Sequence, residues 1–412
     1  MPTTGTTRTT RLGKGFHQLW ASVVVSGLGD GLRLVALPLL AAQLTDDPRK
    51  IAAVALAGQL PWLLLGLLSG ALADRYDRRR ILWTVDAVRA LVVAVLAIVV
   101  AAQAATVPLL IVVAFVLGCG QTLAGGAFVG VLPVLVPDEA RPRANARLQS
   151  GVLISNTLVG TPLGAVLFGL TAALPFVVDA ISFALSAVLL LPLRGDFRPR
   201  TEVLPGTLAS LRRDTVAGVR WLWRHRLLRR LCLVAGIGNL VGGAVIAVLV
   251  LFAEVELGLD GTGFALLLGA SAIGGVAGAS ATPRLYARFS TATLLRLTTA
   301  AAALCVTALG SAASALTAGL AIIGYGAANV AWNVTAVSQR QELVPIELMG
   351  RVNTAYQMVT GSAAALGAAG SGLLAHGYGL RTPFFVAALL LVTACLLSPG
   401  CSTRRGRTGR RP

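Results

Sequence analysis

Long apolar runs alternate with short polar segments from one end of the chain to the other. Twelve runs come close to the roughly 20 residues that an α-helix needs to cross a bilayer core of about 30 Å. They are residues 18–43, 51–72, 81–102, 107–134, 150–170, 173–192, 230–252, 262–282, 291–311, 316–337, 352–375 and 383–399. Runs such as 91–100 do not alternate between apolar and polar residues, unlike the strands of a membrane barrel. The pattern predicts an all-α membrane protein with twelve transmembrane helices.

The amino-acid composition agrees with an integral membrane protein. Of the 412 residues, 56% are hydrophobic and 13% are charged, and the mean hydropathy is +0.78. This leaves too little polar surface to cover a soluble globule of the same size. The first apolar run is too long for a signal peptide and lacks a cleavage site, so we expect the chain to be retained whole in the membrane.

Sequence motifs of enzymes are missing. The three histidines lie in loops or at segment edges, and neither a Walker loop nor a Gly-x-Ser-x-Gly elbow occurs. The five cysteines are odd in number and widely scattered, so no disulfide framework or metal site follows. We therefore expect no enzymatic activity and no cofactor, and any uphill work must draw on an ion or solute gradient.

The net charge of +18 is high enough to suggest nucleic-acid binding, but the placement of the basic residues opposes that interpretation. With the amino terminus inside, thirty of the 35 Lys and Arg residues fall in the inner loops and tails or at the adjoining helix ends. The outer loops hold only Arg49, Lys50 and Arg381. This is the positive-inside distribution, which predicts a multi-pass protein of the cell inner membrane with both termini cytoplasmic and no nucleic-acid partner.

A charged loop joins the second and third apolar runs. Residues 70–80 read Gly-Ala-Leu-Ala-Asp-Arg-Tyr-Asp-Arg-Arg-Arg. One Arg or Asp in hydrocarbon costs roughly 2.5–3.5 kcal/mol, so this loop must lie at the membrane surface and hold the two helices that it joins. The pattern resembles the signature of the major facilitator superfamily. With Asp77 in place of the second Gly, it is similar to the proton-coupled drug and siderophore exporters related to macrolide efflux proteins and the enterobactin exporter.

The two halves of the chain repeat at an offset of 208 residues. Seven of the fifteen positions from 135 to 149 recur as identical residues: Leu135, Val136, Pro137, Glu139, Arg143, Asn145 and Gln149 match Leu343, Val344, Pro345, Glu347, Arg351, Asn353 and Gln357. The resemblance implies two pseudo-symmetric bundles of six helices. We expect an N-terminal bundle over residues 1–192, a cytoplasmic linker over 193–229, and a C-terminal bundle with a basic tail over 230–412.

The resemblance also assigns a gating motif at the inner ends of the two halves. Asp74 of the signature loop would hold the inner ends together in the outward-open state by facing a helix amino terminus, where a negative group is favoured. We predict that Asp86 and Arg89, an i, i+3 pair near the inner end of the third helix, join the same network. The complete set is Gly70, Asp74, Arg75, Arg78, Asp86 and Arg89.

Asp30 lies near the middle of the first helix, where an ionised carboxylate is most costly. Arg33 is three residues further on and therefore lies on the same face. Two interpretations stay open. The pair could be a buried ion pair that fixes helix packing, or Asp30 could be a protonatable site whose charge changes with the side that it faces. The second half carries Asn239 where the first carries Asp30, which favours the functional interpretation.

Several polar and aromatic residues lie within helices that line the central cavity in this superfamily. Interhelical hydrogen bonds of about 0.6 kcal/mol are the simplest explanation for such groups. A polar patch that binds substrate is the functional alternative. The candidates are Gln59, Gln121, Asn156, Asn239, Tyr325, Asn329, Trp332 and Asn333.

These patterns together predict a monomeric secondary transporter that exports a hydrophobic or amphipathic small molecule, such as a drug, antibiotic or secondary metabolite. The resemblance implies proton antiport with alternating access. Few fixed charges near the cavity suit a weakly polar substrate. The alternatives are an uptake facilitator or a lysolipid flippase of the same fold, or a membrane receptor that transports nothing.

Overall fold

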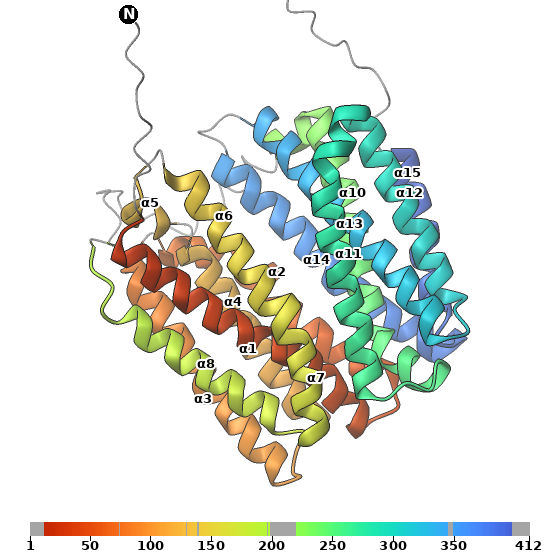
Figure 1. The fold of residues 1–412 in the computed structure, drawn as a ribbon, viewed down its shortest axis with the longest axis horizontal. Coiled ribbons are helices and arrows are strands. Elements are labelled where there is room, and N and C mark those ends of the chain that lie inside the picture. Colours follow the sequence, from red (N-terminus) through yellow and green to blue (C-terminus); the bar gives the residue numbers. More distant parts are fainter. Residues whose placement is uncertain are drawn as a thin grey trace, which may run out of the picture.

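The computed structural model of the protein describes residues 12–73, 75–128, 130–137, 140–195, 197, 220–344 and 349–397. Within these ranges the regular secondary structure is helical throughout, with no strand. The helices form two bundles that lie side by side (Figure 1). This confirms the predicted all-α fold.

The first bundle contains six spans. They are α1 (Lys14–Leu44), α2 (Pro48–Ala73), α3 (Arg78–Ala101), α4 (Val107–Phe128), the continuous segment α6 (Arg141–Val152), η2 (Leu153–Gly160) and α7 (Thr161–Leu170), and α8 (Leu174–Leu190). The short α5 (Leu132–Leu135) lies between α4 and α6.

The second bundle also contains six spans. They are α10 (Arg226–Leu251) with its extension η3 (Phe252–Glu256), α11 (Gly261–Arg288), α12 (Thr291–Gly310), α13 (Ala315–Leu343), α14 (Met349–Tyr378) and α15 (Thr382–Leu397). Among the described residues, nine helical spans are individually long and apolar enough to cross a membrane, and α8 and α15 are shorter apolar helices. The predicted linker over 193–229 stays a prediction, because 198–219 lie outside the described residues, as do the basic residues of the tail.

Two predicted spans have different limits in the structure, and each contains a proline near the point where its helix changes. The run 107–134 does not form one helix: α4 ends at Phe128, and the separate α5 begins at Leu132 with Pro133 in its first turn, where the N–H that proline lacks has no helical partner. The run 150–170 begins earlier, at Arg141, and widens into a π-helical segment before Pro162. There the N–H of Thr161 donates to the carbonyl of Asn156, five residues back.

The widened segment packs closely on α1. Gly31 of α1 lies directly on the backbone of Asn156, since a Cβ at Gly31 would lie 2.1 Å from that carbonyl oxygen. Gly160 in turn meets the carbonyl of Leu28. Small residues thus allow the two backbones to approach, as they do at helix interfaces in membranes generally.

The two bundles share a buried apolar core at one end. We call the end at which α1 begins and α15 ends the terminal end, and the opposite one the far end. At the far end a single apolar core contains residues of both bundles, with Leu39 and Val54 in the same cluster as Val248, Phe252 and Phe264. Contacts of α7 with α11 and of α2 with α14 connect the bundles. Figure 1 shows α7 beside α11.

At the terminal end the buried clusters are confined to one bundle each. Leu19, Leu82 and Leu190 form a cluster of the first bundle, and Leu228 and Leu295 belong to a cluster of the second. Among the described residues, the buried apolar core is therefore shared by the two bundles at the far end and divided between them at the terminal end.

Candidate transport site

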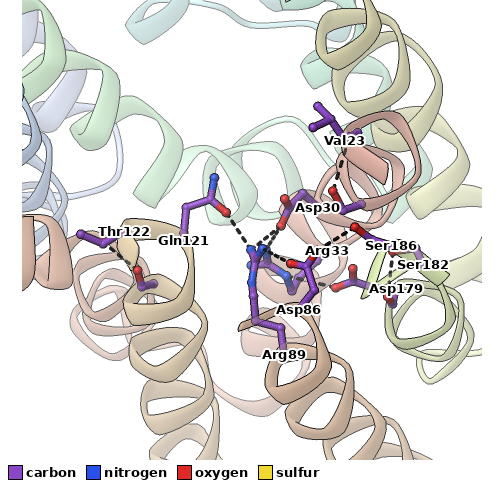
Figure 2. Close-up of polar contacts among 12 residues, drawn as sticks. Val23, Asp30, Arg33, Asp86, Arg89, Gln121, Thr122, Asp179, Ser182 and Ser186 are labelled. Atoms are coloured by element: carbon purple, nitrogen blue, oxygen red, sulfur yellow. Dashed lines mark hydrogen bonds and ion pairs between the residues drawn. The ribbon is translucent and has the colours of Figure 1, made fainter. Parts of the chain in front are cut away.

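Five charged side chains form a continuous chain inside the first bundle (Figure 2). In order they are Asp179 of α8, Arg33 and Asp30 of α1, and Arg89 and Asp86 of α3. The Nε of Arg33 donates to Asp179 Oδ2 at 3.1 Å, and a second nitrogen of Arg33 donates to Asp30. Nη2 of Arg89 donates to Asp30 Oδ1 at 2.9 Å. We call these five residues the charge chain.

Neutral groups complete the charge chain at its α3 end. Asp86 Oδ1 lies 3.7 Å from Nη1 of Arg89, and its Oδ2 accepts a hydrogen bond of 2.6 Å from the hydroxyl of Ser186. Arg89 also donates to the side-chain oxygen of Gln121 at 2.7 Å, and its guanidinium lies 4.1 Å from the centre of the Phe183 ring. Charges in a bilayer persist when they are paired in this way.

The structure groups the charged residues differently from the prediction made from the sequence. The Asp30–Arg33 contact is the one that the i, i+3 spacing predicts. Asp86 and Arg89 were predicted to join the signature loop, but the contacts found for them lead to Asp30, Gln121 and Ser186 instead. The reason is that both point toward α1 and α8 from the body of α3.

Asp179 is the member that sequence reasoning did not assign. It has a fully buried side chain, and within the described part of the protein its Oδ1 has no hydrogen-bond partner. The available signal was a single acid inside the apolar run 173–192. Such residues are rare in membrane helices and need a partner.

A cavity of about 280 Å³ lies beside the charge chain in the first bundle. Asp30, Asp86 and Arg89 line it, together with the predicted residues Gln121 and Asn156. It reaches terminal-end residues such as Leu19 and Leu82. Arg33 and Asp179 are not among its lining residues. We call it the charged cavity.

A second cavity, of about 240 Å³, lies mainly in the second bundle. No charged side chain lines it among the described residues, so we call it the neutral cavity. The nitrogen of Asn239 donates to the carbonyl of Ala235, and that of Asn329 reaches the Tyr325 hydroxyl at 3.4 Å. Six predicted residues gather here: Gln59, Asn239, Tyr325, Asn329, Trp332 and Asn333.

One buried donor beside the neutral cavity has no hydrogen-bond partner among the described residues. This donor is the Nε1 of Trp332. A buried N–H without a partner costs about 1–3 kcal/mol, and a substrate oxygen would satisfy it. The cavity therefore suits an uncharged or weakly polar ligand with a hydrogen-bond acceptor.

The signature loop is fixed to the first bundle. Asp77 caps α3 by accepting hydrogen bonds from the backbone N–H groups of Arg79 and Arg80. Arg78 donates to the carbonyl of Gly130, and Arg79 donates to that of Leu193 at 2.8 Å.

The remaining residues of the predicted gating motif lie at or beyond the end of α2. Gly70 lies within α2, and Arg75 is exposed in the turn that follows. Asp74, the central residue of the predicted gate, lies outside the described residues. Its gating role therefore stays a prediction.

Polar contacts join the two bundles at the far end. The guanidinium of Arg49 donates two hydrogen bonds to Asp47, which holds the pKa of that carboxyl below its usual value. Nδ1 of His376, from α14 in the second bundle, lies 3.8 Å from Asp47 Oδ1. Gly372 of α14 packs on Pro48 and Ala52 of α2.

Comparisons with known proteins identify the relatives of this chain. The profile of the family described as transmembrane secretion effector matches residues 11–408. An uncharacterized MFS-type transporter of Bacillus subtilis (strain 168), YfiS, is 29% identical over 396 residues, covering 93% of this chain and 92% of the relative. The multidrug efflux pump Tap of Mycolicibacterium fortuitum is 28% identical, over 52% of this chain and 53% of its own length.

One further relative and two solved structures are also similar to this chain. Macrolide efflux protein A of Streptococcus pyogenes is 28% identical over 37% of this chain and 38% of its own length. The nucleoside transporter NupG has a TM-score of 0.71 at 15% identity, covering 93% of this chain and 98% of its own. A bacterial homolog of the human lysosomal transporter Spinster, in an inward-facing and occupied conformation, has a TM-score of 0.74 at 14% identity. The match covers 93% of this chain and 95% of the homolog. At these identities the two structures show a shared fold.

Proposed function

The chain belongs to the transmembrane secretion effector family of the major facilitator superfamily, and from that premise we propose that it exports an amphipathic small molecule by proton antiport. It is a secondary transporter and not an enzyme. The observation that carries the proposal is the division of the interior into a charged cavity and a neutral cavity.

The charge chain supports proton coupling. Its three carboxylates lie in the middle of the bundle, where the membrane makes every unpaired charge costly. A change of protonation there must be matched by a rearrangement of the paired arginines. A site with that property links proton binding to the conformational cycle.

The neutral cavity supports a weakly polar substrate. Its lining combines amide groups, the Tyr325 hydroxyl and the Trp332 indole with alanine, valine and isoleucine side chains. A sugar or a dicarboxylate would need more donors or fixed positive charges than this lining offers. The names of the relatives Tap and macrolide efflux protein A agree with a drug or antibiotic as substrate.

The distribution of the buried cores supports alternating access. We place the terminal end in the cytoplasm because the basic loops gather there, which makes the described conformation inward-open. A monomer is sufficient for this cycle, since both cavities lie within one chain.

Everted membrane vesicles test the proposal. With an acidic interior reported by a quenched fluorescent amine, a macrolide should partly restore fluorescence as protons leave in exchange. The variant Asp46→Asn, which changes an exposed acid in a loop, should behave as the wild type. Macrolide binding without any flux would instead favour a receptor, and flux that ignores the pH gradient would favour a facilitator or a lysolipid flippase.

A further inference from the structure

The charge chain holds three carboxylates and two guanidinium groups, so it carries one negative charge in excess when every group is ionised. Arginine does not release its proton in proteins, which leaves the carboxylates as the groups that can restore neutrality. Building on the proposed proton coupling, we propose that the charge chain binds one proton and that Asp179, rather than Asp30, carries it in this conformation.

Asp30 is the best-compensated carboxylate of the three. It lies at the centre of the charge chain, between the two guanidinium groups, and its Oδ1 accepts from both Arg33 and Arg89. Hydrogen bonds from two cations stabilise the ionised form. A proton on Asp30 would leave both arginines facing a neutral group, which makes Asp30 the poorest place for it.

The ionised form of Asp86 is also stabilised by its surroundings. It accepts from the hydroxyl of Ser186 at 2.6 Å, lies 3.7 Å from Arg89, and lines the charged cavity. The cavity gives its carboxylate access to water, which stabilises the charge. Asp86 can therefore stay ionised without binding the proton.

Asp179 has the opposite surroundings. Its only charged hydrogen-bond partner among the described residues is Arg33, through Oδ2, and its Oδ1 has no partner. The space around Oδ1 is filled: a Cβ added to Gly29 would lie 2.2 Å from that oxygen. The hydroxyl of Ser182 donates to the backbone carbonyl of Asp179 and is not bonded to the carboxyl. Leaving an oxygen without a donor is more costly for an ion than for a neutral acid, so the proton belongs here.

The position of Asp179 explains how its proton could be linked to transport. On α8, Asp179 is seven residues from Ser186, or about 10 Å along the helix axis toward the far end. It lines neither the charged nor the neutral cavity. The proton is thus sealed from the terminal end. Releasing it breaks the O–H bond of Asp179 and transfers the proton to water, which requires α1 and α8 to move apart.

Difference infrared spectroscopy of the purified protein in lipid nanodiscs tests this assignment. The wild type should show the C=O band of a buried carboxylic acid at neutral pH. Labelling aspartate with ¹³C at the carboxyl should shift that band. Asp179→Asn, which has the shape of the protonated acid, should abolish it, whereas Asp86→Asn should retain it. A band that persists in Asp179→Asn would overturn the assignment.

A second variant keeps the test decisive if Asp179→Asn does not fold. Asp179→Glu should move the band to a new frequency, and an unmoved band would contradict the assignment. The result is also separable from the proposed function. A band assigned to Asp179 in a protein that moves no macrolide would refute the export proposal and leave the proton site standing. Macrolide antiport by a protein that shows no such band would refute the proton site and leave the export proposal standing.

Discussion

Arg89 of α3 donates a hydrogen bond of 2.9 Å to Asp30 of α1, across the centre of the first bundle. Asp30 also accepts from Arg33 on its own helix. Two cations on two helices thus share one carboxylate. The position of α1 relative to α3 is therefore tied to the charge state of the carboxylates in the charge chain, because both arginines stay protonated.

Removing Arg89 should destabilise the first bundle. Arg89→Ala leaves Asp86 and Asp30 short of a cation in a buried site, and breaking such a pair typically costs about 3–5 kcal/mol. Thermal unfolding in detergent should show a clearly lowered midpoint, with a smaller loss for Arg89→Lys. The control is Arg143→Ala, at an exposed position on α6. Equal midpoints for Arg89→Ala and the control would mean that the charge chain contributes nothing to stability.

Trp332 should contribute to substrate affinity through its unpartnered N–H. Trp332→Phe keeps an aromatic ring in the neutral cavity and removes a buried donor that has no partner among the described residues. We expect macrolide affinity to fall about five- to tenfold, the equivalent of one hydrogen bond of about 1 kcal/mol. The thermal stability of the ligand-free protein should change little. Trp223→Phe, at a half-exposed tryptophan outside both cavities, serves as the control.

Gly372 should control how tightly the far end closes. A Cβ at this position would lie 2.4 Å from that of Ala52 and 2.9 Å from the carbonyl oxygen of Pro48, both on α2. Gly372→Val should therefore push α14 away from α2 and favour the state that is open at the far end. Spin-label distances between the far-end loops would lengthen. Gly370→Val is the matched control, since a Cβ at Gly370 meets nothing within 4 Å.

The orientation of the bundle can be tested by labelling single cysteines in a background without the five natural ones. Cysteines at Asp46 and Tyr378, both exposed at the far end, should react with an impermeant thiol reagent in intact cells. A cysteine at Tyr76, exposed in the signature loop, should react only after the cells are opened. Labelling of Tyr76→Cys in intact cells would invert the topology and the proposed direction of transport.

The sequence was sufficient for the fold and for contacts within one helix. Apolar runs predicted the twelve spans, and the i, i+3 spacing predicted the Asp30–Arg33 contact. Contacts between helices were not accessible in this way. Arg33 and Asp179 are 146 residues apart, and periodicity does not specify which helices become neighbours. Asp86 and Arg89 were grouped with the loop because they are near it in sequence, although nine residues of helix separate Asp77 from Asp86 by about 13 Å.

The amide residues show the same limit. Their placement within apolar runs identified Gln59, Asn239 and Asn333 as candidates, but not that they share one cavity while Gln121 and Asn156 line another. The wide π-helical turn before Pro162 was also missed, since its form depends on packing against Gly31 as well as on the proline.

The most direct test of the central claim is whether a substrate gradient alone drives protons in the opposite direction. Purified protein is reconstituted in liposomes that enclose a pH-sensitive dye, with equal pH on both sides, and a macrolide is added outside. Antiport predicts macrolide entry together with alkalinisation of the interior in the wild type and in Asp46→Asn, and no proton movement in Asp179→Asn. Macrolide entry into wild-type liposomes without any change of internal pH would contradict the account.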